Sequence, residues 1–312
     1  MKQLQAILRQ YGILLGFAAV IVALSILSPS FLTSRNLLNL VRQTSVHGIM
    51  AVGMTFVILS GGIDLSVGSL LALTGVFCAS LERSGVPLPV VVTATLLLGA
   101  AVGAANGVVI TKGRVTPFVV TLGSMSMLRG FAHIYTDGQP ISGFSQAFRW
   151  IGSGEILRIP VPVILLLAVT GVAAFVLRRT VMGRYTYAIG SNAVATRLAG
   201  VSVDPYQCAA YVICGTTSAL GALVLTSRLN AAESVAGTGY ELDVIASVVI
   251  GGTSLMGGRG SVWGTLIGAL LIGAINNGMN LLMIPSYYQL VVKGAIIVAA
   301  VLVDRFRASD LS

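Results

Sequence analysis

The sequence predicts an all-α, polytopic membrane protein with about ten transmembrane helices and both termini in the cytoplasm. Of the 312 residues, 55% are hydrophobic and only 9% are charged, whereas a soluble domain carries about 25% charged residues. Apolar runs of span length recur along almost the whole chain, and the cations lie between them. A soluble fold of this length could not bury so much apolar surface, so lipid is the expected solvent.

Each apolar run predicts a helix, because a segment in hydrocarbon must satisfy its own backbone hydrogen bonds. A full span needs about 20 residues. The expected spans are residues 12–28, 46–62, 66–81, 90–111, 116–135, 159–177, 206–227, 242–256, 262–283 and 287–303. The first run also resembles a signal peptide, but an uncleaved span makes the charge pattern consistent. Residues 31–44 are expected to lie along the outer surface.

The distribution of cations sets the expected orientation. If the spans alternate from a cytoplasmic amino terminus, most cations fall inside, as the positive-inside rule requires. The expected inner cations are Lys2, Arg9, Lys112, Arg114, Arg178, Arg179, Arg184, Arg197, Arg259, Arg305 and Arg307, and the outer ones are Arg35, Arg42, Arg83, Arg149, Arg158 and Arg228. This topology accounts for the net charge of +9, and nucleic acid is not an expected partner.

The chain is expected to form one transmembrane domain over residues 1–312, with an outer loop at 136–158 and a cytoplasmic loop at 178–205. No GxxxxGK[ST] phosphate loop occurs, so ATP hydrolysis would need another chain. The three cysteines lie in apolar stretches without a CxxC, which favours small buried core residues over a disulfide or zinc site. No catalytic or metal site is expected.

Faint internal symmetry predicts two five-span halves of inverted topology. Residues 61–65 (Gly-Gly-Ile-Asp-Leu) and 251–255 (Gly-Gly-Thr-Ser-Leu) each separate two apolar runs and are expected to form tight cytoplasmic turns. Glycines also recur every four residues at 99, 103 and 107, and again at 264 and 268. Such spacing indicates close helix packing, within one chain or between two.

Several polar residues in the spans are candidates for a solute path. Arg129 and Lys293 either face the protein interior or extend to the outer interface. Asp64, with Ser66 in the same turn, either caps the next helix or faces the path. Four asparagines either line a wetted path or bond between helices. The path candidates are Asp64, Ser66, Asn106, Asn276, Asn277 and Asn280.

The remaining acids are assigned to the span ends, Asp243 to the outer side. This placement disfavours a secondary sugar transporter or channel, which would use carboxylates at the midplane. An intramembrane enzyme is disfavoured because His47 and His133 lack a nucleophile at fixed spacing.

The cytoplasmic loop contains a predicted short helix. Ser191 or Asn192 can cap it, it would run to Leu198, and Gly200 can end it. A short helix outside the membrane rests on a soluble partner or on lipid, and the residues alone do not decide between them.

Several stretches, in order, resemble the permease family of carbohydrate ABC importers. They are residues 43–45 (Gln-Thr-Ser), 48–55 (Gly-Ile-Met-Ala-Val-Gly-Met-Thr), 62–70 (Gly-Ile-Asp-Leu-Ser-Val-Gly-Ser-Leu), 236–243 (Ala-Gly-Thr-Gly-Tyr-Glu-Leu-Asp), 251–255 and 286–289 (Ser-Tyr-Tyr-Gln). The resemblance runs from about residue 12 to Asp304. It implies a multi-pass permease in a bacterial inner membrane, with D-ribose as the expected sugar and another pentose or hexose as the alternative.

The resemblance also implies partners: a second copy of the permease, a periplasmic sugar-binding protein on the outer loops, and an ATPase subunit that holds ATP and Mg²⁺ on the inner face. No cofactor is expected on this chain. The loop at 183–200 matches the family's coupling segment, so the implied ATPase contacts are Arg184, Gly190, Asn192, Arg197 and Gly200. Relatives often carry Glu where this chain has Ala193, which argues against an ion pair there. The permease is expected to need no tight sugar site, because the binding protein would supply selectivity. The absence of a dense cluster of aromatic and carboxylate residues in the predicted spans fits this expectation.

Overall fold

The computed structural model describes the backbone of residues 2–309 and the side chains of residues 15–299 and of Leu302. The side chains of the terminal cations Lys2, Arg9, Arg305 and Arg307, on which the expected orientation partly rests, lie outside the described residues. The helices are α1 (Lys2–Leu27), α2 (Ser34–Leu59), α3 (Val67–Arg83), α4 (Leu88–Gly113), α5 (Pro117–Thr136), α6 (Gln146–Ser153), α7 (Val161–Arg179), α8 (Val181–Leu198), α9 (Val203–Leu229), α10 (Tyr240–Ile250), α11 (Val262–Leu281) and α12 (Ser286–Ser309).

The strands are short and form two antiparallel pairs. They are β1 (Ile141–Ser142), β2 (Glu155–Ile156), β3 (Ile159–Pro160) and β4 (Ala231–Ala232). β1 pairs with β4, and β2 pairs with β3. The structure therefore confirms an all-α polytopic architecture, in which the strands only tie loops together.

Every predicted apolar run falls on a helix. α6 and α8 lie in the predicted outer and cytoplasmic loops. Among the described residues, α4, α7, α9 and α11 have both the length and the hydropathy of a membrane span.

One local prediction is wrong. Residues 31–44 do not form a separate surface segment, because α2 is continuous from Ser34 to Leu59. The Thr33 side chain accepts a hydrogen bond from the Asn36 backbone N–H (3.4 Å), which starts the helix at Ser34. Thr33 thus supplies the side-chain acceptor that a helix start favours, and no proline interrupts α2 before its end.

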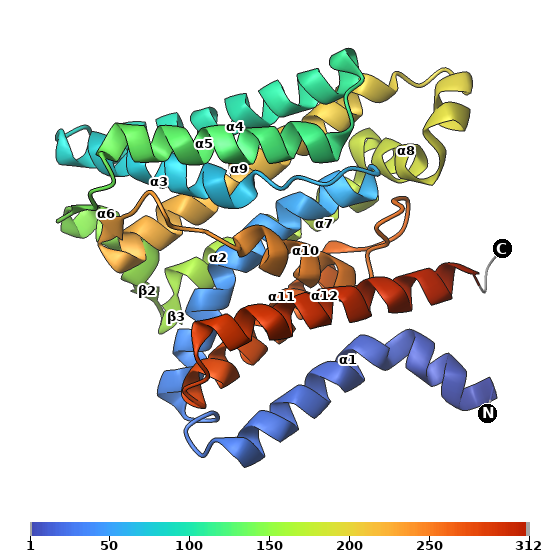
Figure 1. Ribbon diagram of the computed structural model, residues 1–312, viewed down its shortest axis with the longest axis horizontal. Coiled ribbons are helices and arrows are strands. Elements are labelled where there is room, and N and C mark those ends of the chain that lie inside the picture. The colour runs from blue at the N-terminus through green and yellow to red at the C-terminus, as the bar shows by residue number, and fades with distance from the viewer. Residues whose placement is uncertain (1, 310–312) are drawn as a thin grey trace.

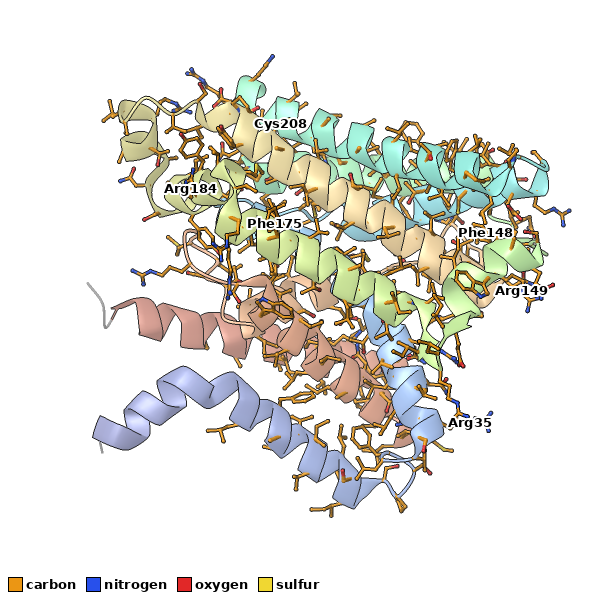
Figure 2. The ribbon with its side chains drawn as sticks, turned by 180° about the vertical axis from the view of Figure 1, so that it is seen from behind. Arg35, Phe148, Arg149, Phe175, Arg184 and Cys208 are labelled. Atoms are coloured by element: carbon orange, nitrogen blue, oxygen red, sulfur yellow. The ribbon has the colours of Figure 1, made fainter. Side chains whose placement is uncertain are left out.

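The predicted outer and cytoplasmic loops lie at opposite ends of the molecule. α6 and the β2–β3 pair lie at one end, and α8 lies at the other, which is also the end where the described chain begins and finishes (Figure 1). Arg35 and Arg149, which the sequence assigns to the outer side, lie at the α6 end, whereas Arg184 lies at the opposite end (Figure 2). The α6 end is called the outer end below, and the α8 end is called the inner end.

The glycine repeats join helices of the same chain. A Cβ at Gly103 of α4 would lie 2.2 Å from the Tyr211 carbonyl oxygen of α9, and one at Gly99 would lie 2.5 Å from the Gly215 carbonyl oxygen. In α11, a Cβ at Gly268 would lie 2.0 Å from the Ser247 carbonyl oxygen of α10. The backbones therefore touch along α4–α9 and α10–α11, and a side chain at these glycines would separate the helices.

This packing predicts different outcomes for two glycine substitutions. Gly103→Ala should destabilise the protein by about 1–3 kcal/mol, since the new methyl group overpacks a backbone contact. Gly171→Ala in α7 is the matched control, because nothing lies within 4 Å of a Cβ there; it should be neutral or slightly stabilising through helix propensity. Thermal denaturation of the two purified variants in detergent compares them, and equal melting temperatures would contradict the backbone contact.

Candidate functional site

The candidate site is organised by α10, which is too short to cross a membrane. Its 11 residues extend about 16 Å, against a hydrocarbon thickness of about 30 Å. The chain passes from β4 through an irregular segment to Gly239, whose φ of +81° suits glycine. α10 therefore begins near the middle of the molecule (Figure 1), and its first turn carries Asp243 into the interior.

Arg129 of α5 holds the irregular segment that precedes α10. Its Nη1 donates to the carbonyl oxygens of Ser234 (2.7 Å) and Ala236 (2.6 Å). The Ser234 hydroxyl lies 2.9 Å from His133 Nδ1. Irregular backbone inside a membrane needs such donors, because lipid supplies none. Of the two alternatives left open for Arg129, the structure selects the contact within the protein.

Lys293 of α12 forms an ion pair with Asp243, at 2.8 Å from Nζ to Oδ2. The two side chains are 19% and 3% exposed. His47 Nε2 of α2 lies 3.6 Å from the same oxygen, and Asn276 Nδ2 of α11 lies 3.4 Å from it. The Tyr240 ring packs against the His47 ring with centroids 4.1 Å apart. These five residues are called the Asp243 cluster.

The Asp243 cluster overturns one expectation. Asp243 does not lie at the outer end, because α10 starts inside the bundle and Asp243 is buried there. Two signals in the sequence pointed there. The Gly-Thr-Gly at residues 237–239 lies just before the apolar run at 242–256, and a Lys inside a span needs a counter-charge.

A second polar group connects α3, α4 and α5. Asp64, 1% exposed, accepts hydrogen bonds through Oδ1 from the Ser66 backbone N–H (2.9 Å) and hydroxyl (2.6 Å). Asn106 Nδ2 donates to Ser66 Oγ (3.1 Å), and Ser124 Oγ donates to Asn106 Oδ1. Asp64 thus stabilises the turn before α3 through these two hydrogen bonds. The path candidates Asp64, Ser66 and Asn106 therefore lie together. Ser124 could not be predicted from the sequence, because a serine in a span gives no distinctive signal.

The three asparagines of α11 have different partners. Asn277 and Asn36 of α2 exchange two amide hydrogen bonds of 2.9 Å. Asn280 Oδ1 accepts from Gln289 Nε2 (2.9 Å). Among these three asparagines, only Asn276 joins the Asp243 cluster. Asn277 therefore bonds between helices, one of the two roles that the sequence left open.

The helix α8 breaks where the sequence predicts a cap. Asn192 leaves the helical conformation (φ −161°, ψ 100°), and its Oδ1 accepts from the Ala195 backbone N–H (2.9 Å). Gly200, with φ +84°, follows the end of the helix. The predicted short helix from Asn192 to Leu198, ended by Gly200, is confirmed.

One face of α8 packs against the end of α2 and against the loop between α10 and α11. A Cβ at Gly190 would lie 1.8 Å from the Leu59 carbonyl oxygen and 2.4 Å from the Gly258 nitrogen, so only glycine fits there. Gly258 N donates to the same Leu59 oxygen (3.0 Å). Tyr187 donates its hydroxyl to the Gly260 carbonyl oxygen (2.9 Å), and burial raises its pKa, which keeps the phenol protonated as a donor.

The other face of α8 is exposed. Arg184, Asn192 and Arg197 are exposed there, and Gly200 is exposed just after the helix. Gly190, the fifth expected coupling residue, is half-buried against Leu59 and Gly258. Arg197 pairs with Asp204 at 3.1 Å. The apolar side chain of Leu198 is 84% exposed, which is the kind of surface that a partner or lipid covers.

Comparisons with known proteins identify the family to which the chain belongs. The family model described as the branched-chain amino acid transport system / permease component matches residues 36–301. A ribose import permease protein of Haemophilus influenzae is 50% identical over 298 residues, which covers 93% of this chain and 92% of the relative. The chain is 47% identical to a ribose import permease protein of Bacillus subtilis (97% and 95% covered) and 40% identical to a D-allose transport system permease protein of Escherichia coli (95% and 91%).

No solved structure matches the chain. The family match covers most of the sequence, and the relatives align over nearly their whole lengths. The chain therefore belongs to the family of membrane permeases described as the branched-chain amino acid transport system / permease component.

Proposed function

We propose that this chain is the membrane-spanning permease subunit of an ATP-driven importer of D-ribose. The observation that carries the proposal is the 50% and 47% identity, along nearly the whole chain, to permeases named for ribose import. The family title names branched-chain amino acids. Sugar is preferred here because the relatives with the higher identities carry sugar names, and identity falls to 40% for the D-allose permease.

The whole chain acts as one transmembrane permease domain of a bacterial inner membrane, with ten spans, both termini in the cytoplasm and two inverted halves of five spans. Nine apolar helices, with α10 and the irregular segment before it making a tenth crossing, and the opposite positions of α6 and α8 support this topology. The two Gly-Gly turns, at residues 61–65 and 251–255, support the repeat because each separates two apolar runs.

The inner and outer ends of the molecule contact different partners. A separate ATPase subunit, which holds ATP and Mg²⁺, contacts the exposed face of α8 through Arg184, Asn192, Arg197 and Gly200. Gly190 passes the displacement of α8 to Leu59 of α2 and to the loop after α10. A periplasmic sugar-binding protein docks at the α6 end, and a second copy of the permease completes the path. The permease itself has no catalytic site, metal or cofactor.

ATP binding moves the ATPase subunits, α8 follows, and the path opens outward to accept sugar from the binding protein; hydrolysis resets it. The path residues are Asp64, Ser66, Asn106, Asn276 and Asn280, whose side chains can bond to sugar hydroxyl groups. Asn277 is left out because its amide is paired with that of Asn36. Since α10 follows the outer loops and precedes the loop that touches Gly190, it connects α8 to the Asp243 cluster.

Reconstitution tests the function. The chain is co-expressed with its candidate ATPase and binding protein, placed in liposomes, and assayed for uptake of labelled ribose. Uptake should require both ATP and the binding protein, because the permease has no energy source of its own. Uptake without ATP would instead favour a secondary transporter, and ATP-driven uptake of leucine but not ribose would reassign the solute.

The coupling role of α8 predicts a position-specific loss of assembly. Leu198→Glu should reduce ATPase co-purification about tenfold or more, since burying a leucine side chain contributes about 1.5–3 kcal/mol. Leu157→Glu is the matched control, because Leu157 is 91% exposed between β2 and β3 at the outer end. Affinity purification through a tag on the permease measures the ATPase that is retained. Equal retention by both variants would remove α8 from the interface.

A further inference from the structure

The Asp243 cluster contains buried polar atoms that have no hydrogen-bond partner among the described residues. They are Asp243 Oδ1, His47 Nε2 and Asn276 Oδ1. Asp243 is almost fully buried. Buried polar atoms in folded proteins are nearly always paired with protein or water, so three unpaired atoms in one cluster point to a ligand or to water.

A cavity lined mainly by polar residues lies at the outer end, one turn of α2 away from this cluster. It has a volume of about 250 Å³ and lies between α2, α6 and α9, lined by Asn39, Arg42, Gln43, Gly152, Ser153, Arg228 and Leu229. Gln43 precedes His47 by four residues, so the two lie one helical turn apart on one face of α2. His47 and Lys293 keep 18% and 19% of their side chains exposed. The cluster is therefore accessible at its edge and buried at Asp243.

The chemistry of the cluster fits a neutral polyhydroxy solute better than an ion. The Lys293 ammonium repels a cation, and the Asp243 carboxylate repels an anion. A sugar hydroxyl both donates and accepts, so it can donate to Asp243 Oδ1 or Asn276 Oδ1 and accept from Lys293 or His47. The Tyr240 ring adds an apolar surface beside a polar edge, as binding sites for small molecules commonly do.

We propose that His47, Tyr240, Asp243, Asn276 and Lys293 form a sugar-binding site within the permease, reached from the outer end along α2. This inference rests on the proposed function and deepens it, because it locates where the sugar binds during passage. The site would bind sugar weakly, because Lys293 and Asp243 already satisfy much of each other's hydrogen bonding.

The first test separates sugar passage from ATP hydrolysis. Asn276→Leu removes one amide from the cluster and leaves the Lys293–Asp243 pair in place. In the reconstituted importer it should lower ribose uptake per ATP hydrolysed about tenfold, the effect of losing one good hydrogen bond. Thr265→Val is the matched control, because it removes another hydrogen bond between α11 and a neighbouring helix, the 2.8 Å bond to Thr55 of α2. It should keep the wild-type ratio.

A second measurement does not depend on turnover. His47→Cys is made in a chain whose Cys78, Cys208 and Cys214 are replaced by alanine, and its labelling by a thiol reagent is timed in the assembled importer. Ribose should slow labelling at least about threefold, and leucine should not, because its side chain offers no hydroxyl groups. Leu157→Cys in the outer loop should be unaffected by either solute.

The outcomes are distinguishable. If wild-type uptake is ATP-driven but Asn276→Leu keeps its uptake-to-ATP ratio and ribose gives no protection, the site is wrong and the proposed function stands. Protection by leucine instead of ribose also overturns the site. If the wild-type chain shows no ATP-driven ribose uptake at all, the proposed function itself fails.

Discussion

The ion pair between Lys293 and Asp243 is the constraint on which the interior of the protein depends. Hydrocarbon offers no partner for a charge or for irregular backbone, yet α10 begins inside the bundle. Lys293 neutralises its first turn, and Arg129 occupies the carbonyl oxygens just before it. A buried pair adds little net stability, but removal of one partner typically costs about 3–5 kcal/mol. The pair therefore fixes where α10 starts and which helices surround it.

The close backbone contacts make room for this arrangement. α4 touches α9, and α10 touches α11, through glycines whose Cβ atoms would collide with carbonyl oxygens. α10 is packed against α11, and α2 contributes Asn39, Arg42 and Gln43 to the cavity at the outer end. The same principle recurs at the inner end, where Gly190 allows α8 to approach Leu59 and Gly258.

The sequence predicted what local physics determines. Apolar runs gave the helices, because lipid admits hardly any other structure, and the break at Asn192 followed from the capping preference of asparagine. The partners of distant residues were not predictable. Lys293 and Asp243 are 50 residues apart, and Asn277 and Asn36 are 241 apart. Such pairs depend on how the helices are arranged, which composition and spacing do not encode. The sequence placed Asp243 at the outer side, because nothing in the apolar run at 242–256 indicates that its helix, α10, has only 11 residues and starts inside the bundle.

The contact at Gly190 has a mechanical consequence. Side chains at a joint can change rotamer and so absorb a displacement, but a junction of backbone against backbone has no such compliance. A shift of α8 by a fraction of an ångström is therefore passed to Leu59 and Gly258 at nearly full amplitude. In the proposed importer, stiffness at this one contact would let a small displacement of α8 at the inner side reach α2 and the loop after α10 without loss.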